Sequence, residues 1–293
     1  MMMTTRSNFT GWRLRVLALA GAVTAFAGFA AADDLEGSIQ IKGSDTMVNL
    51  CQAWAEGFMI QHPKVTVAVT GGGSGTGIAA FIAGTCDLAA VSRRMTDKEI
   101  ASASSQGRAV KEWTVALDGL AVVVHPENPV KRLTLRQLAE VFTGQIRNWR
   151  ELGGADQGVV LLSREVNSGT HVYFKEHVLG SSQEFAPEAL LLPSSQAIAD
   201  EVATNQAGIG YYGMGYLNPK NAVVAVAKVA TEPYVAPSEQ TVRDGTYPIS
   251  RPLFLYSTRE PSVLAKAFLD FTLSAQGQAI VQQIDFVPVG ERR

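Results

Sequence analysis

The sequence predicts an α/β protein with two lobes, each a mainly parallel sheet flanked by helices. Strand-like and helix-like segments alternate along the 293-residue chain. They form two successive sets, of which the second begins with the apolar run Leu120–His125. No linker rich in Pro or Ser separates the sets, so we expect extended strands near Leu117–Val122 and Tyr211–Tyr216 to connect the lobes. The chain would then enter the second lobe once and return.

The first set contains three strands, each followed by a helix. The strands are expected from alternating or continuous apolar residues at Ser38–Lys42, Val65–Thr70 and Leu88–Val91. The helices are expected from apolar spacing at Met47, Leu50, Cys51, Trp54 and Phe58, from Ile78, Phe81 and Ile82 before a stop near Gly84, and from the capping-box pattern of Thr96 with Glu99. This order favours parallel strands joined by helices on the sheet faces.

The second set and the tail continue the alternation. The expected elements are a helix capped by Thr134 and Gln137, a strand at Gly158–Ser163, helices at Ser168–Val178 and from Ser194–Ser195 to about Thr204, a strand at Gly208–Tyr212, strands near Val223–Val226 and Leu253–Tyr256, and helices at Ser262–Leu273 and Ala275–Ile284. We therefore assign residues 33–118 and 213–293 to the first lobe, and residues 119–212 to the second.

The first 32 residues are expected to be a secretory signal peptide. A basic stretch ends at Arg15, and the apolar segment Val16–Ala32 follows it. The small residues Ala30 and Ala32 fit an A-x-A cleavage site. A membrane anchor is the alternative, but 17 residues rich in Ala and Gly are short for a membrane span. We expect a soluble, exported protein.

Composition limits the classes of partner. Hydrophobic residues make up 46% of the chain and charged residues 18%, which supports a sizeable core. The formal net charge is −2, and the predicted signal peptide carries only basic charges, so the exported part is more acidic. A mildly acidic protein is a poor partner for nucleic acid or an anionic membrane. A small anion remains compatible, because backbone dipoles can bind it without net charge.

The cysteines and histidines do not indicate a metal or redox site. Cys51 and Cys86 are the only two thiols. In an oxidising compartment they could form a disulfide, or they could remain two buried thiols. Their spacing excludes C-x-x-C chemistry, and two thiols cannot complete a structural zinc site. Metal-ligand spacing is also absent among the four histidines, which are His62, His125, His171 and His177.

Three polar turns lie where apolar strands lead into helices: Gly43–Thr46, Gly71–Gly77 and Ser163–Thr170. A helix start presents unpaired backbone N–H groups and the positive end of a dipole. Glycines allow close approach, hydroxyl groups add donors, and Arg164 adds a planar charged fork. A single turn of this kind is usually only a turn or a helix cap. Together, the three turns predict a site for one tetrahedral anion.

Catalytic motifs match these turns poorly. A nucleophile elbow read from Gly72 would need glycine where Thr76 stands. A P-loop would need lysine after Gly77, where the sequence has Ile78. His171 directly follows the third turn and could contact the ligand, although an ordinary helix residue is the simpler interpretation. We expect a binding protein rather than an enzyme.

The order of these motifs resembles the phosphate-binding component of bacterial phosphate ABC transporters, over nearly all of the exported chain. The motifs are Gly43-Ser44-Asp45-Thr46, the Gly71–Gly77 run, the segment from Cys86 to Arg93, Arg164-x-x-x-Ser168-Gly169-Thr170, Asn148-Trp149, Gly208-Ile209-Gly210-Tyr211, and Tyr247-Pro248 leading to Arg251-Pro252-Leu253. The resemblance implies a type 2 periplasmic-binding-protein fold that closes on one inorganic phosphate. It also implies a periplasmic location and delivery of phosphate to an inner-membrane permease, with no cofactor.

Matched position by position, the resemblance implies phosphate contacts from all three turns and from the segment after Val91. The candidate ligand-binding residues are Ser44, Asp45, Thr46, the Met47 backbone N–H, Ser74, Ser92, Arg93, Arg164, Ser168, Gly169 and Thr170. One position departs from the family pattern: many relatives have an aspartate where this chain has Ser92. That carboxylate accepts the proton of HPO₄²⁻ and helps to reject sulfate. We expect Asp45, in the first turn, to take this role.

Three other functions stay open at this point. The protein could bind another oxyanion such as sulfate or molybdate. It could be an exported phosphatase, although no metal constellation is visible in the sequence. It could also act at the cell surface while retaining phosphate binding. We expect a monomer that does not bind nucleic acid.

Overall fold

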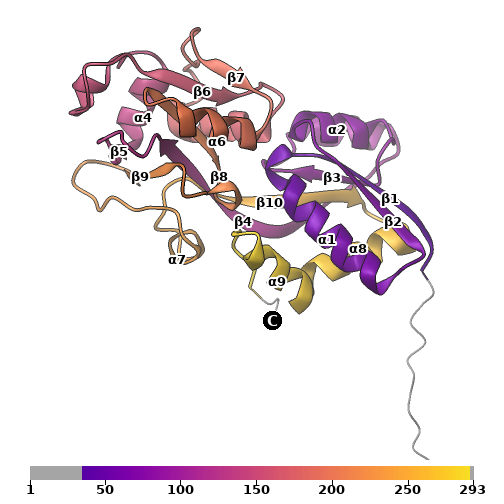
Figure 1. Cartoon of the computed structure of the whole chain (residues 1–293). Helices are drawn as coiled ribbons and strands as arrows, with labels where there is room; N and C mark the ends of the chain where they lie inside the picture. Colours follow the sequence, from indigo (N-terminus) through magenta and orange to yellow (C-terminus); the bar gives the residue numbers. More distant parts are fainter. Residues whose placement is uncertain (1–34, 291–293) are drawn as a thin grey trace, which may run out of the picture. The chain divides into compact units, whose positions relative to one another are not determined.

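The structure, a computed structural model, describes residues 35–290, so the predicted signal peptide lies outside the described residues. Within this part, ten strands form one sheet (Figure 1). The strands are β1 (Gly37–Gly43), β2 (Val65–Thr70), β3 (Leu88–Val91), β4 (Val110–Val124), β5 (Arg132–Thr134), β6 (Val160–Arg164), β7 (Leu190–Leu192), β8 (Gly208–Gly213), β9 (Ala222–Ala227) and β10 (Ser250–Thr258).

Helices connect most of the strands. The α-helices are α1 (Val48–Gln61), α2 (Ser74–Ile82), α3 (Asp97–Ser105), α4 (Leu135–Phe142), α5 (Gly169–Phe174), α6 (Ser195–Thr204), α7 (Glu239–Arg243), α8 (Val263–Leu273) and α9 (Ala275–Gln283). Short 3₁₀ turns occur at η1 (Asp45–Met47), η2 (Trp149–Leu152) and η4 (Met214–Tyr216), and η3 (Lys175–Leu179) is a π-helical turn. No helix within residues 35–290 has the length and apolar character needed to cross a membrane.

The sheet joins two parallel groups through antiparallel strands. Its order is β2-β1-β3-β10-β4-β8-β6-β7, with β9 beside β4 and β5 beside β9. Strands β1, β2 and β3 are parallel to one another, and so are β6, β7 and β8. Strand β10 is antiparallel to both β3 and β4, and β4 is antiparallel to β8. The predicted α/β class is confirmed, and the antiparallel centre is a feature that the sequence analysis did not anticipate.

Strand β4 runs through both parallel groups (Figure 1). Its first part, up to Gly119, pairs with β10, and its last part, Leu120–Val124, pairs with β8 and β9. The sequence predicts an extended connecting strand near Leu117–Val122 and an apolar run from Leu120, whereas β4 begins already at Val110. Lys111 and Glu112 interrupt the apolar pattern in this first part of the strand. Strand β9 pairs with Val122–Val124 and with β5, although it lies within the segment expected to return to the first lobe.

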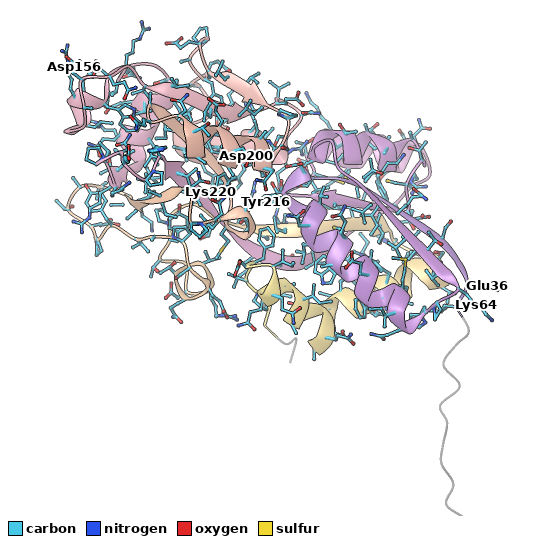
Figure 2. All side chains as sticks on the ribbon, viewed as in Figure 1. Glu36, Lys64, Asp156, Asp200, Tyr216 and Lys220 are labelled. Carbon is cyan, nitrogen blue, oxygen red and sulfur yellow. The ribbon has the colours of Figure 1, made fainter. Side chains whose placement is uncertain are left out.

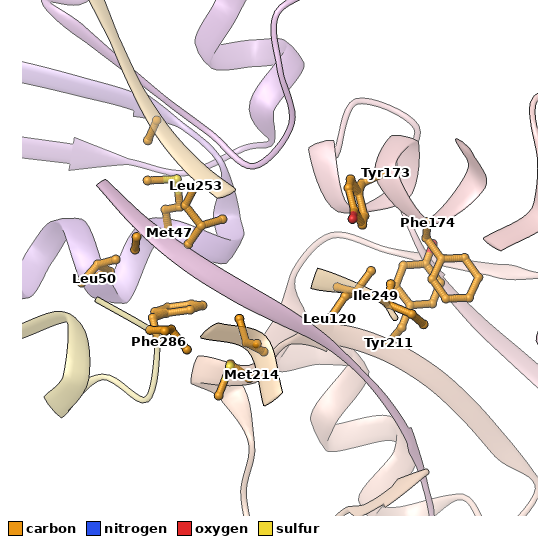
Figure 3. Packing of buried hydrophobic residues seen from close by; sticks show 14 of the residues in the cluster. Met47, Leu50, Leu120, Tyr173, Phe174, Tyr211, Met214, Ile249, Leu253 and Phe286 are labelled. Atoms are coloured by element: carbon orange, nitrogen blue, oxygen red, sulfur yellow. The ribbon is translucent and has the colours of Figure 1, made fainter. Parts of the chain in front are cut away.

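The largest core cluster extends along both groups of strands. At one end it contains Met47 and Leu50 from η1 and α1, and at the other Phe174 and Tyr211 (Figure 3). Trp54 of α1 belongs to the same cluster. The C-terminal helix α9 packs at the end of the cluster that contains Trp54. The Trp54 indole Nε1 donates a 2.8 Å hydrogen bond to the Gly277 carbonyl in α9. Burial of large apolar side chains is the main favourable term in folding. The two groups of strands therefore share a continuous core.

Each parallel group also has a smaller cluster on its opposite face. In β3, Leu88 and Ala90 face the large cluster, whereas Ala89 and Val91 face Ile78 and Phe81 of α2. In β4, Val122 faces the large cluster and Val123 packs with Ile198 of α6. Alternating side chains along a strand point to opposite faces, so both faces of the sheet carry helices.

Both thiols are free, and the disulfide considered from the sequence is not formed in this structure. The sheet separates them: Cys51 on α1 packs in the cluster that includes Leu88, whereas Cys86 packs with Ala89 on the other face. Burial raises the pKa of Cys51 to about 12 and the pKa of Cys86 to about 11. Both groups are consequently protonated, buried thiols at neutral pH.

Candidate anion-binding site

Polar residues of all three predicted turns meet at one place. Turn 1 (Gly43–Thr46) lies at the end of β1, turn 2 (Gly71–Gly77) follows β2, and turn 3 (Ser163–Thr170) lies at the end of β6. The hydroxyl oxygens of Thr46 and Thr170 lie 2.7 Å apart, which joins turns 1 and 3. A Cβ atom built on Gly169 would lie 2.3 Å from Ser74 Oγ and 2.7 Å from Ser92 Oγ, so turn 3 also approaches turn 2 closely. Only glycine fits at position 169 in this arrangement.

The local sequence explains how these turns are held. Gly72 and Gly73 have φ values of 108° and 96°, which favour glycine, and α2 begins directly after them at Ser74. Ser168 is the N-cap of α5, and its hydroxyl accepts a 3.2 Å hydrogen bond from the Thr170 N–H. Ser44 is buried at the start of turn 1, and its N–H donates to the Ala90 carbonyl.

Arg164, at the end of β6, is 1% exposed and makes contacts on three sides. Its Nε and Nη2 donate to the carbonyls of Leu192 (3.3 Å) and Pro193 (2.8 Å). Its Nη1 donates to Ser195 Oγ at 3.0 Å and lies 3.2 Å from Asp45 Oδ2. Burial lowers the pKa of Arg164, and the charge of Asp45 opposes this effect. The guanidinium remains charged at neutral pH and is fixed in orientation.

Asp45 connects turn 1 with the start of α6. Besides the ion pair with Arg164, its Oδ2 accepts a 2.8 Å hydrogen bond from the Ser195 N–H. The Asp45 carbonyl accepts a 2.8 Å hydrogen bond from the hydroxyl of Tyr216. Figure 2 labels Tyr216. The Asp45 side chain keeps 18% of its surface exposed. The ion pair and the hydrogen bond from Ser195 both involve Oδ2.

Ser92 joins the cluster, whereas the side-chain hydrogen bonds of Arg93 go to other residues. Ser92 Oγ lies 3.2 Å from Ser74 Oγ, and the Ser92 N–H donates to Ser74 Oγ at 3.0 Å. Arg93 instead forms two hydrogen bonds with the Glu99 carboxylate, of 2.7 and 2.9 Å. Burial alone would raise the pKa of Glu99, but the contacts with Arg93 and Thr96 lower it. The capping-box glutamate of α3 thus holds the guanidinium expected to contribute charge to the site.

Met47 is fully buried, and its backbone N–H donates to the Ser44 carbonyl at 3.0 Å. This hydrogen bond closes the 3₁₀ turn η1. The N–H expected to face a ligand therefore has a partner within turn 1.

A buried ion pair that the sequence analysis did not identify supports the cluster. Arg251 Nε and Nη2 donate to Asp118 Oδ2 at 2.9 and 2.8 Å. Arg251 also donates to Thr170 Oγ1 at 2.9 Å and to the Ser92 carbonyl at 3.0 Å. The Met214 N–H donates to Asp118 Oδ1 at 3.0 Å. The signal for this pair was a charged residue within each of two apolar strands, where charges are rare unless paired.

His171 packs in the protein interior, next to the cluster. Its Nδ1 is 3.3 Å from Ser163 Oγ, which in turn is 2.7 Å from the Tyr211 hydroxyl. The imidazole packs at 4.6 Å from the Phe185 ring and is 8% exposed. Burial lowers its pKa, so the neutral form is favoured. These contacts are those of an interior helix residue.

The arrangement suits an oxyanion better than a metal ion. Hydroxyl groups and two buried arginines are donors of the kind that bind phosphate-like anions. In residues 35–290, no group of three or more His, Cys, Asp or Glu side chains could hold a metal ion. The candidate site thus has the chemistry of an anion receptor.

Known proteins resemble this chain over most of its length. The sequence profile of the PBP superfamily domain matches residues 29–276. The phosphate-binding protein PstS of Pseudomonas aeruginosa is 34% identical over 275 residues, covering 88% of this chain and 85% of that protein. The phosphate-binding protein PstS of Bacillus subtilis is 33% identical over 258 residues, covering 88% and 82%.

Two solved structures extend these similarities to the fold. A substrate-binding protein from Clostridium perfringens, solved with bound phosphate, has a TM-score of 0.79 at 33% identity and covers 86% of this chain and 100% of that one. An ABC-type phosphate transport receptor from Vibrio cholerae has a TM-score of 0.69 at 30% identity, covering 86% and 100%.

Proposed function

Since the chain belongs to the PBP superfamily, we propose that it is a solute-binding protein that captures inorganic phosphate and delivers it to the permease of an ABC transporter. The observation that carries this proposal is the convergence of turns 1, 2 and 3 on Thr46, Ser74 and Thr170. Relatives named as phosphate-binding proteins support the choice of anion. Capture and release need no covalent step, so the proposed function requires neither a cofactor nor enzymatic activity.

We assign the phosphate contacts to hydroxyl, backbone and guanidinium donors. The proposed ligands are Thr46, Ser74, Ser168, the Gly169 N–H, Thr170 and Arg164, with Ser44, Met47 and Ser92 shaping the surrounding turns. Arg251 orients Thr170, because it donates to that hydroxyl. Arg93 is not included, since Glu99 binds its guanidinium.

Asp45 is the residue that we propose to distinguish phosphate from sulfate. The contacts of Asp45 with Arg164 and Ser195 both use Oδ2 rather than Oδ1. Asp118, the other carboxylate of the cluster, is less suited to this role, because Met214 and Arg251 bind both of its oxygens. A carboxylate oxygen can accept the proton of HPO₄²⁻, but it repels sulfate, which has no proton to donate. An unsatisfied buried polar group costs about 1–3 kcal/mol, and more when it is charged.

We propose two lobes that close over the anion, with a boundary that differs from the sequence-based one. Because β9 pairs with Val122–Val124 and β5, we assign residues 119–249 to the second lobe. The first lobe then comprises residues 33–118 and the return from β10 onward. We further propose that residues 1–32 direct export to the periplasm, where the protein acts as a monomer.

The first test is calorimetric titration of the protein lacking residues 1–32, with phosphate and then with sulfate. Bound anion is first removed by partial unfolding and refolding. We expect saturable one-to-one phosphate binding and little response to sulfate. A folded protein that binds neither anion would contradict the proposed function, and comparable binding of both would point to a general oxyanion receptor.

Replacement of the selecting carboxylate gives a sharper result. In Asp45→Asn, we expect the ratio of phosphate to sulfate affinity to fall at least about tenfold, or about 1.4 kcal/mol, because the amide can donate to sulfate. Asp156→Asn is the control, since it removes the same charge from an exposed ion pair (Figure 2). An unchanged ratio in Asp45→Asn would exclude Asp45 as the selector.

A further inference from the structure

Asn167, just before the Ser168-Gly169-Thr170 segment, reaches across to turn 2. Its side-chain Nδ2 donates to the Gly72 carbonyl at 2.9 Å and to Thr76 Oγ1 at 3.3 Å. Its carbonyl accepts a 2.9 Å hydrogen bond from the Gly75 N–H. Asn167 therefore binds turn 2 through both its side chain and its backbone.

The glycines of turn 2 are shaped for this contact. A Cβ atom on Gly73 would lie 2.8 Å from the Asn167 carbonyl oxygen, and one on Gly75 would lie 3.2 Å from it. Gly73 also has a φ of 96°, which disfavours other residues. Thr76 completes the surface, since its hydroxyl donates to the same Gly72 carbonyl at 2.7 Å. Part of the glycine-rich run thus serves the approach of turn 3 rather than the approach of an anion.

These contacts lie at the rim of the candidate site. Asn167, Gly72 and Thr76 are exposed, whereas Ser74, Ser168 and Thr170 are buried. The rim contacts join β6–α5 to β2–α2, which belong to different parallel groups of the sheet. They can form only when turns 2 and 3 have come together, and they do not use any donor assigned to phosphate.

We propose that Asn167 is a positioning residue that latches turn 3 onto turn 2 and sets how long phosphate stays bound. This inference rests on the proposed function and adds a residue outside the anion contacts. Phosphate must leave through a state in which turns 2 and 3 have separated, so the Asn167 hydrogen bonds oppose release. Capture begins from the separated state, in which these bonds do not exist. The latch therefore slows dissociation and leaves association unchanged.

The test compares Asn167→Ala with Val166→Ala. Val166 is the adjacent residue, is neutral and is 68% exposed, so it controls for a truncation in the same segment. Release is measured by chasing labelled phosphate with excess unlabelled phosphate, and affinity by calorimetry. We expect Asn167→Ala to release phosphate about tenfold faster, which corresponds to about 1.4 kcal/mol, with an association rate within about twofold of the wild type. Val166→Ala should match the wild type.

If Asn167 only stabilised the fold, Asn167→Ala would lower the melting temperature of the ligand-free protein. We expect instead the same melting temperature in Asn167→Ala, Val166→Ala and the wild type. We also expect Thr76→Ala to accelerate release in the wild-type background and to have a smaller effect in the Asn167→Ala background, because the two side chains share one hydrogen-bond network.

Two outcomes would overturn the latch. One is an unchanged release rate in Asn167→Ala, and the other is a loss of affinity that appears in the association rate or in the stability of the ligand-free protein. Both presuppose a wild type that binds phosphate. If the wild type does not bind, the proposed function fails first, so the two failures are distinguishable. If Asn167→Ala does not fold, the Thr76→Ala release rate alone decides, and a wild-type value contradicts the latch.

Discussion

Asp118 and Arg251 are both almost completely buried, and each depends on the other. Removing two charges from water is costly, and the cost is recovered only if both remain paired and hydrogen-bonded. Here both charged groups are hydrogen-bonded. Asp118 accepts hydrogen bonds from Arg251 and Met214, and Arg251 also donates to Thr170 and to the Ser92 carbonyl. The pair holds one proposed phosphate donor in place while contributing to the core.

Replacing one member of this pair should destabilise the protein strongly. For Asp118→Asn, we expect the free energy of unfolding to fall by about 3–5 kcal/mol, because a buried guanidinium loses its counter-charge. Urea unfolding monitored by circular dichroism measures this change. The control is Asp270→Asn, in the exposed pair with Lys266, for which we expect a loss of about 0.5 kcal/mol or less. Equal losses in the two variants would refute the role of burial.

His171 should make stability depend on pH. Burial lowers its pKa, so at mildly acidic pH the unfolded chain binds a proton that the folded chain does not. The stabilisation is complete above the unfolded pKa of about 6.5 and is lost as the pH falls toward the folded pKa. We expect the unfolding free energy to decrease from pH 7.5 to pH 5.5, and His171→Gln to show a smaller decrease. The same decrease in both proteins would assign the effect to other groups.

Some site residues were predictable and others were not, for identifiable reasons. Thr46, Ser74 and Thr170 follow apolar strands in glycine- and hydroxyl-rich turns, and this local pattern was sufficient to predict that they lie close together. That they bind phosphate stays a prediction. The pairing of Arg251 with Asp118 was missed because it joins positions 133 residues apart: a charge within an apolar strand indicates that a partner exists, but not which residue it is. The contact of Arg93 with Glu99, six residues away, was not expected: it uses Nη1 and Nη2 of the guanidinium. A role of Arg93 at the site stays a prediction.

Among the helices and strands, the local sequence pattern predicted an element where one of its faces is clearly apolar. The alternation at Val65–Thr70 gave β2 with its observed limits, and the capping boxes expected for α3 and α4 are present. Strands β5 and β7 were missed, because three residues are too few for a periodicity. The expected helix Ser168–Val178 consists of α5 followed by the π-helical turn η3, a change of winding that apolar spacing does not indicate.

The N-cap of α6 gives a test at this scale. Ser194 Oγ accepts a 3.0 Å hydrogen bond from Ala197, and the next residue, Ser195, binds both Asp45 and Arg164. Thr134 caps α4 in the same way, away from the site. We expect Ser194→Ala and Thr134→Ala each to cost about 0.5–2 kcal/mol of stability.

Only Ser194→Ala should also weaken phosphate binding, because it loosens the residue that orients Arg164. Calorimetric titration of both variants measures this difference. If the two variants keep the same phosphate affinity, α6 does not position the site.

At the scale of the whole molecule, the continuous core couples the two groups of strands. The large cluster contains Trp54 on α1 and Tyr211 on β8, which lie in different groups. Cooperative units of unfolding follow such shared packing. We therefore expect α1 and β8 to become exposed together as urea is raised, measured by hydrogen exchange with mass spectrometry.

Phosphate binding provides a second test of this shared core. At a free phosphate concentration of 100 times the dissociation constant, phosphate should stabilise α1 and β8 equally, by about 2.7 kcal/mol. Protection of β8 but not α1 would indicate two independent folding units.

Strand β10 has a consequence for the order in which the chain becomes structured. It begins at Ser250, yet it lies between β3 and β4 and is the strand through which the first parallel group is joined to β4. A nascent chain ending before this residue lacks the central strand, the guanidinium that pairs with Asp118 and the helices that cover α1. Most of the polypeptide must therefore be synthesised before the sheet can close. If the chain is exported as proposed, the completed sheet with β10 between β3 and β4 can form only after residue 250 is available.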